Sequence, residues 1–166
     1  RRIARFNPDG SLDASFNPSS GADGDVLALA LQPDGKVLVG GWFNYVNDVA
    51  RSRIARLNAD GSLDASFNPG SGANSGIDAI GIQSDGKVVI GGFFGTVNGV
   101  SRNRVARLNS DGGLDTSFNP GSGPDHDVIS IAVEATGKVL IGGRFTRVNG
   151  VARNRIARLN ADGTLD

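Results

Sequence analysis

A repeat with a period of 51 residues runs through the whole chain and restricts its fold more than any other feature. The phrase RIARLNADG stands, word for word or nearly so, at 2–10, 53–61, 104–112 and 155–163. The register never slips, and residues 154–166 repeat the pattern of residues 1–13. Self-similarity of this kind is typical of arrays in which each repeat is one supersecondary unit.

Each repeat contains four short apolar stretches separated by turn residues. In the middle copy they are 76–83, 87–93, 104–109 and 113–118. Short runs of Val, Ile, Leu and Phe bounded by Gly, Asp and Asn predict β-strands. The composition agrees, because 25 glycines and a single glutamate, Glu134, leave few strong helix formers. We therefore predict an all-β chain.

The repeated phrase predicts a β-hairpin. Residues 58–62, Asn-Ala-Asp-Gly-Ser, fit a type I turn whose glycine, Gly61, takes a positive φ in a G1 bulge. This turn places Leu57 opposite Leu63 and Arg56 opposite Asp64. The Arg–Asp pair recurs as Arg5–Asp13, Arg107–Asp115 and Arg158–Asp166. We interpret the phrase as a structural hairpin whose cross-strand ion pair sets the register.

The polarity of the four stretches indicates how they stack. The first two are apolar on both faces, as in VLALALQ and KVLVGGWF, and so belong between neighbouring layers. The last two carry polar residues. A repeated four-stranded antiparallel meander is the sequence form of a β-propeller blade. Glycine pairs such as Gly40-Gly41 end the second stretch, where we expect backbones to crowd.

We predict one repeat domain, 1–166, with the following divisions. Residues 1–25 hold the third and fourth strands of a preceding or partner blade plus a linker, 26–76 and 77–127 are blades, and 128–166 is a blade with a truncated last strand.

The motifs DGKVLVGG, RIARLN and DGSLDASFNP carry a family resemblance. A unit built from them resembles the delta-60-type β-propeller repeat of bacterial proteins, and the resemblance covers the entire chain. It implies a tandem-repeat propeller of the kind found in secreted or cell-surface multidomain proteins. It implies no defined enzymatic activity, cofactor or catalytic residue. The third unit departs slightly, with Thr136 where Asp34 and Asp85 stand.

Three units are fewer than the four to eight blades of a closed propeller. The segment can belong to a larger ring. Alternatively, two copies can join into a six-bladed ring, a homo-oligomer in which the amino-terminal strand of one copy finishes the last blade of the other through exposed blade edges. The remaining alternative is a β-trefoil, which leaves the overlap between 154–166 and 1–13 unexplained.

Charge and residue usage exclude several kinds of partner. Lys plus Arg and Asp plus Glu both number 17, so the net charge is zero, and we expect neither a nucleic-acid groove nor a polybasic membrane patch. The chain has no cysteine, which excludes disulfides and thiolate metal sites. No apolar run is long enough for a membrane span. We expect no cofactor.

Two groups of residues suggest chemistry. Asn58, Asp60 and Asp64 offer oxygens around a glycine, as calcium loops do, but the final bidentate glutamate is missing and the hairpin explains all three. His126 stands between two aspartates without a nucleophile or second histidine. We therefore expect no metal site, no catalytic residue and no enzyme. The alternative is an enzyme site built on blades of a larger propeller, since the first strands here supply only Asp78 and Glu134.

The units differ most in the loop after the second strand and in the linker between units. In a meander both lie at the same end of the blade, and variable loops on a rigid scaffold are where recognition usually resides. The predicted ligand contacts are Trp42, Asn44, Tyr45, His126, Arg144 and Arg147. The alternative for Trp42 is that it fills the space that Phe93 fills in its copy. We expect a secreted or cell-surface module that binds protein or glycan.

Overall fold

The computed structural model describes residues 2–166, so the first residue of the predicted ranges 1–25 and 1–166 lies outside it. These residues form β-strands, turns and loops without a helix, which confirms the all-β prediction. In particular, the described part of the chain holds no helix of the length and apolarity that a membrane crossing requires.

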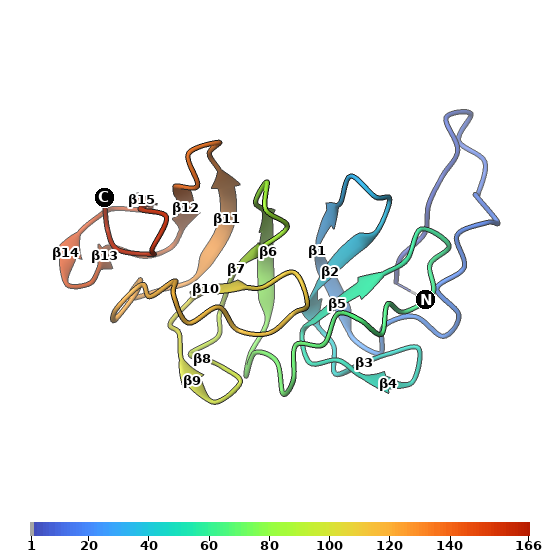
Figure 1. Cartoon of the computed structure of the whole chain (residues 1–166), viewed down its shortest axis with the longest axis horizontal. Coiled ribbons are helices and arrows are strands. Elements are labelled where there is room, and N and C mark those ends of the chain that lie inside the picture. The colour runs from blue at the N-terminus through green and yellow to red at the C-terminus, as the bar shows by residue number, and fades with distance from the viewer. Residues whose placement is uncertain (1) are drawn as a thin grey trace.

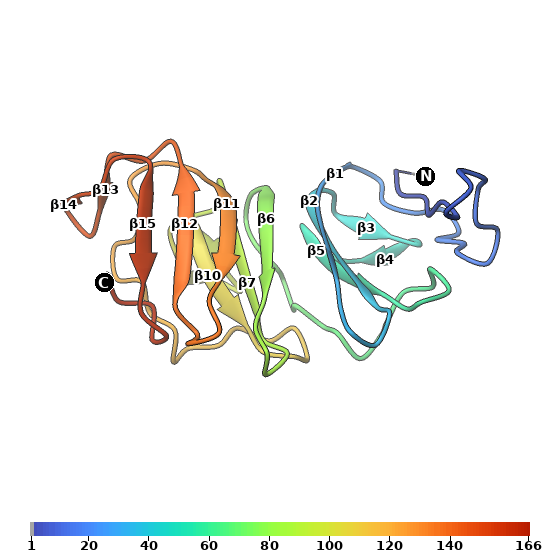
Figure 2. The same cartoon turned by 90° about the horizontal axis from the view of Figure 1, so that it is seen from above.

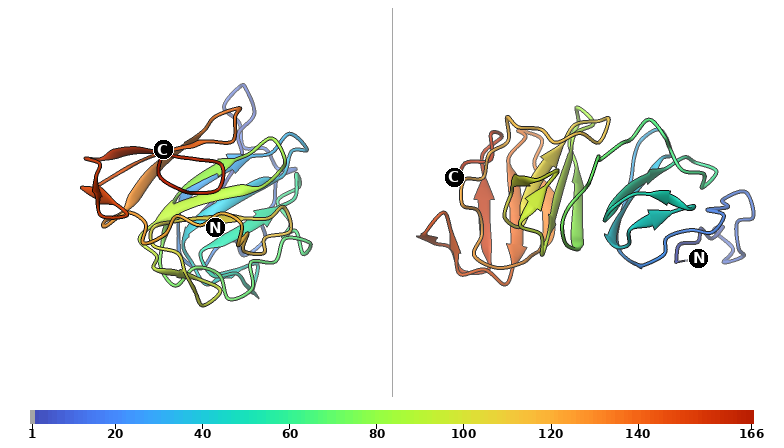
Figure 3. Two further views of the ribbon diagram at one scale, coloured as in Figure 1. Left: turned by 60° about the vertical axis from the view of Figure 1, so that its left-hand side comes forward. Right: turned by 90° about the horizontal axis from the view of Figure 1, so that it is seen from below.

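Three antiparallel sheets of three strands each form the framework. The first sheet contains β1 (Asp25–Leu31), β2 (Val37–Trp42) and β5 (Ile54–Leu57), the second β6 (Ile77–Ile82), β7 (Val88–Gly92) and β10 (Val105–Leu108), and the third β11 (Val128–Val133), β12 (Val139–Gly143) and β15 (Ile156–Leu159). They lie in a row, with the two termini at opposite ends (Figures 1 and 2). The view from below shows the same row (Figure 3, right).

A two-stranded hairpin follows the middle strand of each sheet. These hairpins are β3 (Tyr45–Val46) with β4 (Val49–Ala50), β8 (Thr96–Val97) with β9 (Val100–Ser101), and β13 (Arg147–Val148) with β14 (Val151–Ala152). The sheets of the described residues share no strand, so the β-trefoil alternative, which needs one barrel closed by all units, is wrong. The physical reason is that strands apolar on both faces stack as layers.

The predicted hairpin of the repeated phrase is confirmed. Leu57 and Leu63 form an antiparallel bridge, and the amide of Asp64 donates to the carbonyl of Arg56 at 2.9 Å. Gly61 has a φ of +87°. The same bridge recurs at Phe6–Leu12, Leu108–Leu114 and Leu159–Leu165.

The predicted fourth strand is not confirmed, because the stretch after the turn makes only that single bridge and each sheet ends at its third strand. The cause is a second turn directly beyond it. The Asp64 carboxylate accepts from the amide and the hydroxyl of Ser66, and the amide of Phe67 donates back to the carbonyl of Asp64. The chain therefore bends away from β5 and carries the Phe67 ring into the core, where it is fully buried.

The glycine pair at the end of the middle strand lies where backbones crowd, as predicted. A Cβ on Gly41 would stand 1.9 Å from the carbonyl oxygen of Asp25 on the neighbouring strand. A Cβ on Gly40 would stand 2.9 Å from Cγ2 of Ile77, which belongs to the next sheet. Gly41 thus permits close strand pairing, and Gly40 permits close sheet packing.

The cores lie between neighbouring sheets. Leu38 and Ile54 of the first sheet are buried with Ile77, Ile90 and Phe67. Val89 and Val105 of the second sheet are buried in the same way with third-sheet residues and Phe118. The first strands β1, β6 and β11 contact one another in turn and form the inner edge of the row.

Candidate functional site

The variable loops and the linkers lie together at one end of the sheets. Each linker forms a bridge with the small hairpin of its unit, at Ala22–Val46, Ala73–Val97 and Pro124–Val148. The tight turns between the first two strands of each sheet point to the top of Figure 1, while β3–β4 and β8–β9 lie at the bottom. We call this second end the loop-bearing end.

A linker carboxylate or amide fastens each variable loop. Oδ1 of Asp23 accepts from the amides of Asn44 at 2.8 Å and Tyr45 at 2.9 Å. Asn74 and Asp125 make the same pair of bonds one and two repeats later. The bond from the Tyr45 amide lowers the pKa of Asp23. The loops that carry the predicted contact residues are therefore held in a defined shape.

Trp42 is the last residue of β2, at the loop-bearing end, and is 44% exposed. Its indole lies against Gly76, where an added Cβ would stand 2.3 Å from Cε2 of the tryptophan. The guanidinium of Arg53 lies 5.5 Å from the centre of the indole. One repeat later, Phe93 is 45% exposed with Arg104 at 4.6 Å from its ring.

Arg144 holds the same position in the third unit, and its side chain is largely exposed with Nη1 at 3.9 Å from Asp127. We call Trp42, Phe93 and Arg144, with Arg53 and Arg104, the aromatic–arginine ridge. Sequence reasoning missed Phe93 as a contact residue, although its 51-residue spacing from Trp42 marks it as the equivalent position.

The other predicted contact residues lie nearby on separate loops. Tyr45, on β3, is half-exposed. Arg147, on β13, is tied to its own hairpin because Nη1 donates to the carbonyl of Gly150 at 2.9 Å. His126 is exposed, and its Nδ1 accepts from the amide of Asp127 at 2.9 Å. These residues lie at the equivalent end of their own units and do not form a single cluster.

Asp127 is a buried carboxylate that sequence reasoning did not single out as a site. Its Oδ1 has no hydrogen-bond partner within the protein, and its Oδ2 lies 3.3 Å from Nδ1 of His126. Burial and the charge of Asp127 raise the pKa of Asp78 on β6. Among residues 2–166, no three His, Cys, Asp or Glu side chains are placed to hold a metal ion.

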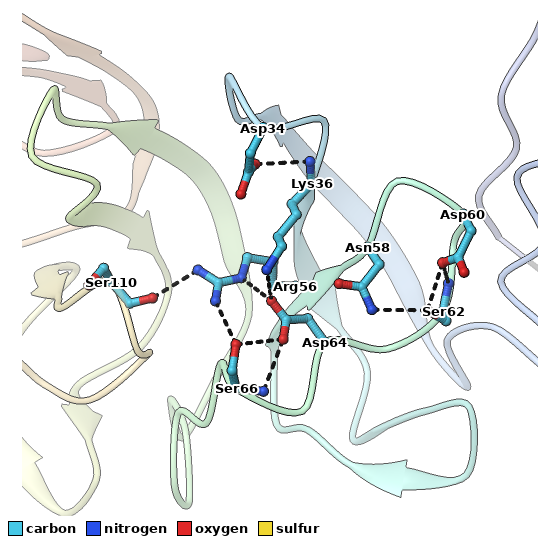
Figure 4. Close-up of polar contacts among 9 residues, drawn as sticks. All are labelled: Asp34, Lys36, Arg56, Asn58, Asp60, Ser62, Asp64, Ser66 and Ser110. Atoms are coloured by element: carbon cyan, nitrogen blue, oxygen red, sulfur yellow. Dashed lines mark hydrogen bonds and ion pairs between the residues drawn. The ribbon is translucent and has the colours of Figure 1, made fainter.

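The residues considered for calcium are engaged in the hairpin (Figure 4). Oδ1 of Asp60 accepts from both the amide and the hydroxyl of Ser62, and Nδ2 of Asn58 donates to that hydroxyl. Oδ2 of Asp64 accepts from Arg56 at 2.7 Å and from Lys36 at 2.8 Å. These oxygens accept hydrogen bonds within the turn and the ion pair, as the structural interpretation of the repeated phrase predicts.

The Arg–Asp pair also joins neighbouring units. Nη1 of Arg56 donates to the carbonyl of Ser110, 54 residues later, at 2.8 Å (Figure 4). The Arg56 guanidinium also lies 4.9 Å from the centre of the Phe67 ring. Arg5 binds the carbonyl of Ala59 and Arg107 that of Ala161 in the same way. We call each Arg–Asp pair with this third bond a clasp.

Acid is expected to destabilise the chain through the two buried clasps. Burial by itself would raise the pKa of Asp64, but hydrogen bonds from Lys36, Ser66 and Arg56 lower it well below the ordinary 3.8. Asp115 shows the same balance. Since the folded chain holds these protons more weakly than the unfolded chain, the stabilisation is present above about pH 4 and is lost as the pH falls through the folded-state pKa.

Urea midpoints measured from about pH 7 down to about pH 2 test this pH dependence, which should steepen below about pH 4. Replacing Asp64 and Asp115 with asparagine should flatten the acid limb. An acid limb of equal steepness in this double variant would contradict the role of the clasps.

Side-by-side antiparallel sheets, with their first strands together at the inner edge and a repeated clasp between units, define a protein of the β-propeller class. The chain belongs to the β-propeller family described as a domain of unknown function, DUF5122, which it matches at residues 1–16, 32–67, 83–118 and 134–166. A comparison with curated proteins found no match.

Proposed function

We propose that the chain is a non-enzymatic interaction module that binds a protein or a glycan through the aromatic–arginine ridge. One observation carries this proposal: Trp42 and Phe93 stand half-exposed at equivalent positions, each with an arginine on its ring. Half-exposed aromatic rings beside arginines supply stacking area, cation–π contacts and hydrogen-bond donors, which dominate recognition surfaces.

The scaffold beneath the ridge favours recognition over catalysis. The linker bonds of Asp23, Asn74 and Asp125 hold the loops in shape, so little conformational entropy is lost when a ligand binds. Glu134 lies 3.6 Å from Arg158, and at the inner edge burial and the charge of Asp127 raise the pKa of Asp78. General acid–base catalysis at this edge would need ionisable groups in addition to Glu134 and Asp78.

The finer parts of the proposal follow from the sequence repeat. The unit is a propeller blade of delta-60 type, and the stretch after each hairpin turn, such as 63–68, takes the place of a fourth strand. The resemblance favours a bacterial protein that acts outside the cell or at its surface. Within this proposal the ridge faces the ligand and the sheets serve as the support.

Replacing Trp42 with alanine is expected to weaken ligand binding by at least about tenfold, as loss of a tryptophan anchor does. Glycan and peptide arrays probed with the chain identify the ligand, and calorimetry then compares variants. Phe6→Ala is the matched control, since Phe6 is an exposed aromatic residue, 65% accessible, on the amino-terminal hairpin outside the ridge. Equal affinity of the two variants, or no ligand on either array, would contradict the proposal.

A further inference from the structure

The contact between neighbouring sheets has two unlike halves. On one side, a glycine in the middle strand leaves a hollow, and on the other, apolar side chains of the next first strand fill it. A Cβ on Gly40 would stand 3.1 Å from Cδ1 of Ile80. One repeat later, a Cβ on Gly91 would stand 3.0 Å from Cδ1 of Ile131. The same hollow and the same filling side chain therefore recur at both contacts.

The third sheet presents the hollow half with nothing in it. We call Leu140, Gly142 and Ile156 the C-terminal face. Ile156 is 63% exposed, while Ile54 and Val105 at the same position are almost fully buried by the next sheet. The hollow has a volume of about 280 Å³, and its lining includes all three residues of the face.

The first sheet presents the filling half. We call Leu29 and Leu31 on β1 the N-terminal face; they are 56% and 72% exposed. Their counterparts on β6, Ile80 and Ile82, pack against the core between the first two sheets. The row thus ends in an unfilled hollow at the third sheet and in unpacked filling side chains at the first sheet. Figure 2 shows these two sheets at opposite ends of the row.

The Arg–Asp pairs at the two ends of the row also differ in this way. Arg158 bonds Asp166 like its counterparts, but its Nη1 faces Glu134 at 3.6 Å, whereas Nη1 of Arg56 and of Arg107 donates to a carbonyl of the next hairpin. The equivalent carbonyl at the other end is that of Ala59, which Arg5 occupies at 2.8 Å. The hairpin 2–13 therefore stands where the hairpin after β15 of another copy would dock.

We infer that the C-terminal face binds the N-terminal face of a second copy of this chain, head to tail, by the contact that joins sheets within the chain. In the complex, Arg158 of one copy takes the carbonyl of Ala59 from Arg5 of the other, and the hairpin 2–13 moves aside. That hairpin is weakly held, since Phe6 and Leu12 are both more than 60% exposed. Two copies of three sheets make six, within the four to eight of closed propellers.

Sedimentation of the 166-residue chain tests the inference, over about 1 µM to about 1 mM. We expect a concentration-dependent dimer or longer head-to-tail oligomer. Ile156→Lys on one face, or Leu29→Lys on the other, should each weaken association by at least about 100-fold, because a charge would have to be buried without a partner. A monomer across the whole range overturns the inference.

The matched control is Ile129→Asp. Ile129 is 51% exposed on the same sheet, but the equivalent residue in the second unit is Asp78, so this position accepts an acidic side chain inside the row. This variant should associate like the parent chain. If it loses association as strongly as Ile156→Lys, exposed apolar area in general is responsible, and the specific contact is wrong.

A mixture of the two lysine variants distinguishes the specific contact from nonspecific association of apolar surfaces. The Ile156→Lys chain keeps an intact N-terminal face, and the Leu29→Lys chain keeps an intact C-terminal face. Each alone should be monomeric, while an equimolar mixture should form a one-to-one complex through the single intact pair of faces. Failure of this mixture to associate, with both variants folded by circular dichroism, would refute the head-to-tail arrangement.

The two terminal arginines make a further matched pair. Arg158→Ser should weaken association, because the complex loses the bond to the carbonyl of Ala59. Arg5→Ser should leave association as strong or strengthen it, because it loosens the hairpin that has to move. The opposite order of effects would contradict the exchange of clasps. This association uses the sheet faces and not the loop-bearing end, so it stands or falls independently of ligand binding.

Discussion

Arg56→Ala is expected to lower the free energy of unfolding by about 3 kcal/mol or more, as removal of one partner from a buried ion pair does. The Arg56 side chain is only 9% exposed. It bonds Asp64 on the facing strand, Ser66 beyond it and the carbonyl of Ser110 in the next unit. The alanine leaves Asp64 buried with Lys36 as its remaining charged partner, and it removes a tie between two sheets.

Arg158→Ala is the matched control for Arg56→Ala. Arg158 makes the same pair with Asp166, but its side chain is 48% exposed and its Nη1 faces Glu134 of its own unit. The urea midpoint of this variant should equal that of the parent chain, measured at a concentration where both are monomeric. An equal loss of unfolding free energy in Arg56→Ala and Arg158→Ala would show that the ion pair itself, and not its burial between units, determines stability.

Gly41→Ala is expected to lower the free energy of unfolding by about 3 kcal/mol or more, at the upper end of overpacking effects. The added methyl group would stand 1.9 Å from the carbonyl oxygen of Asp25 and 2.9 Å from its carbonyl carbon. Both are backbone atoms of the paired strand, so a rotamer change cannot relieve the clash. The β1–β2 pairing has to open at this position, close to its bulge between Val26 and Ala28.

Gly95→Ala is the control for this substitution. A Cβ on Gly95 would meet its nearest neighbour at 3.6 Å, an ordinary contact, and the other units carry Asn44 and Thr146 at the same position. The free energy of unfolding of Gly95→Ala, measured by chemical denaturation, should therefore lie within about 0.5 kcal/mol of that of the parent chain. If Gly41→Ala is equally mild, the close approach of the strands is not essential to the sheet.

Features that depend on neighbouring residues were predictable. The Asp-Gly turn specifies which residues face each other across the hairpin, so the Leu57–Leu63 bridge and the pairing of Arg56 with Asp64 followed from residue types and spacing. The arrangement of the loop-bearing end was predictable only in part. The common end of loop and linker followed from the meander, but the bonds of Asp23 to two loop amides did not.

The missing fourth strand shows where pattern reasoning failed. The stretch 113–118 has strand-like composition, yet Asp115 accepts from the amide and hydroxyl of Ser117 and turns the chain. The Phe118 ring is then buried between the second and third sheets. Alternation of residue types predicts an extended stretch, but a local side-chain bond competes with the ladder.

The sequence by itself determined the period, the all-β character and the register of the repeated-phrase hairpins, because these depend on turn chemistry and polarity within a few residues. Only the tertiary structure decided which arginine reaches 54 residues onward, which rings fill the space between sheets and which apolar faces stay exposed. The physical reason is that identical repeats have identical local preferences. Burial of Ile54 and exposure of Ile156 differ solely because a further sheet packs against one and not the other.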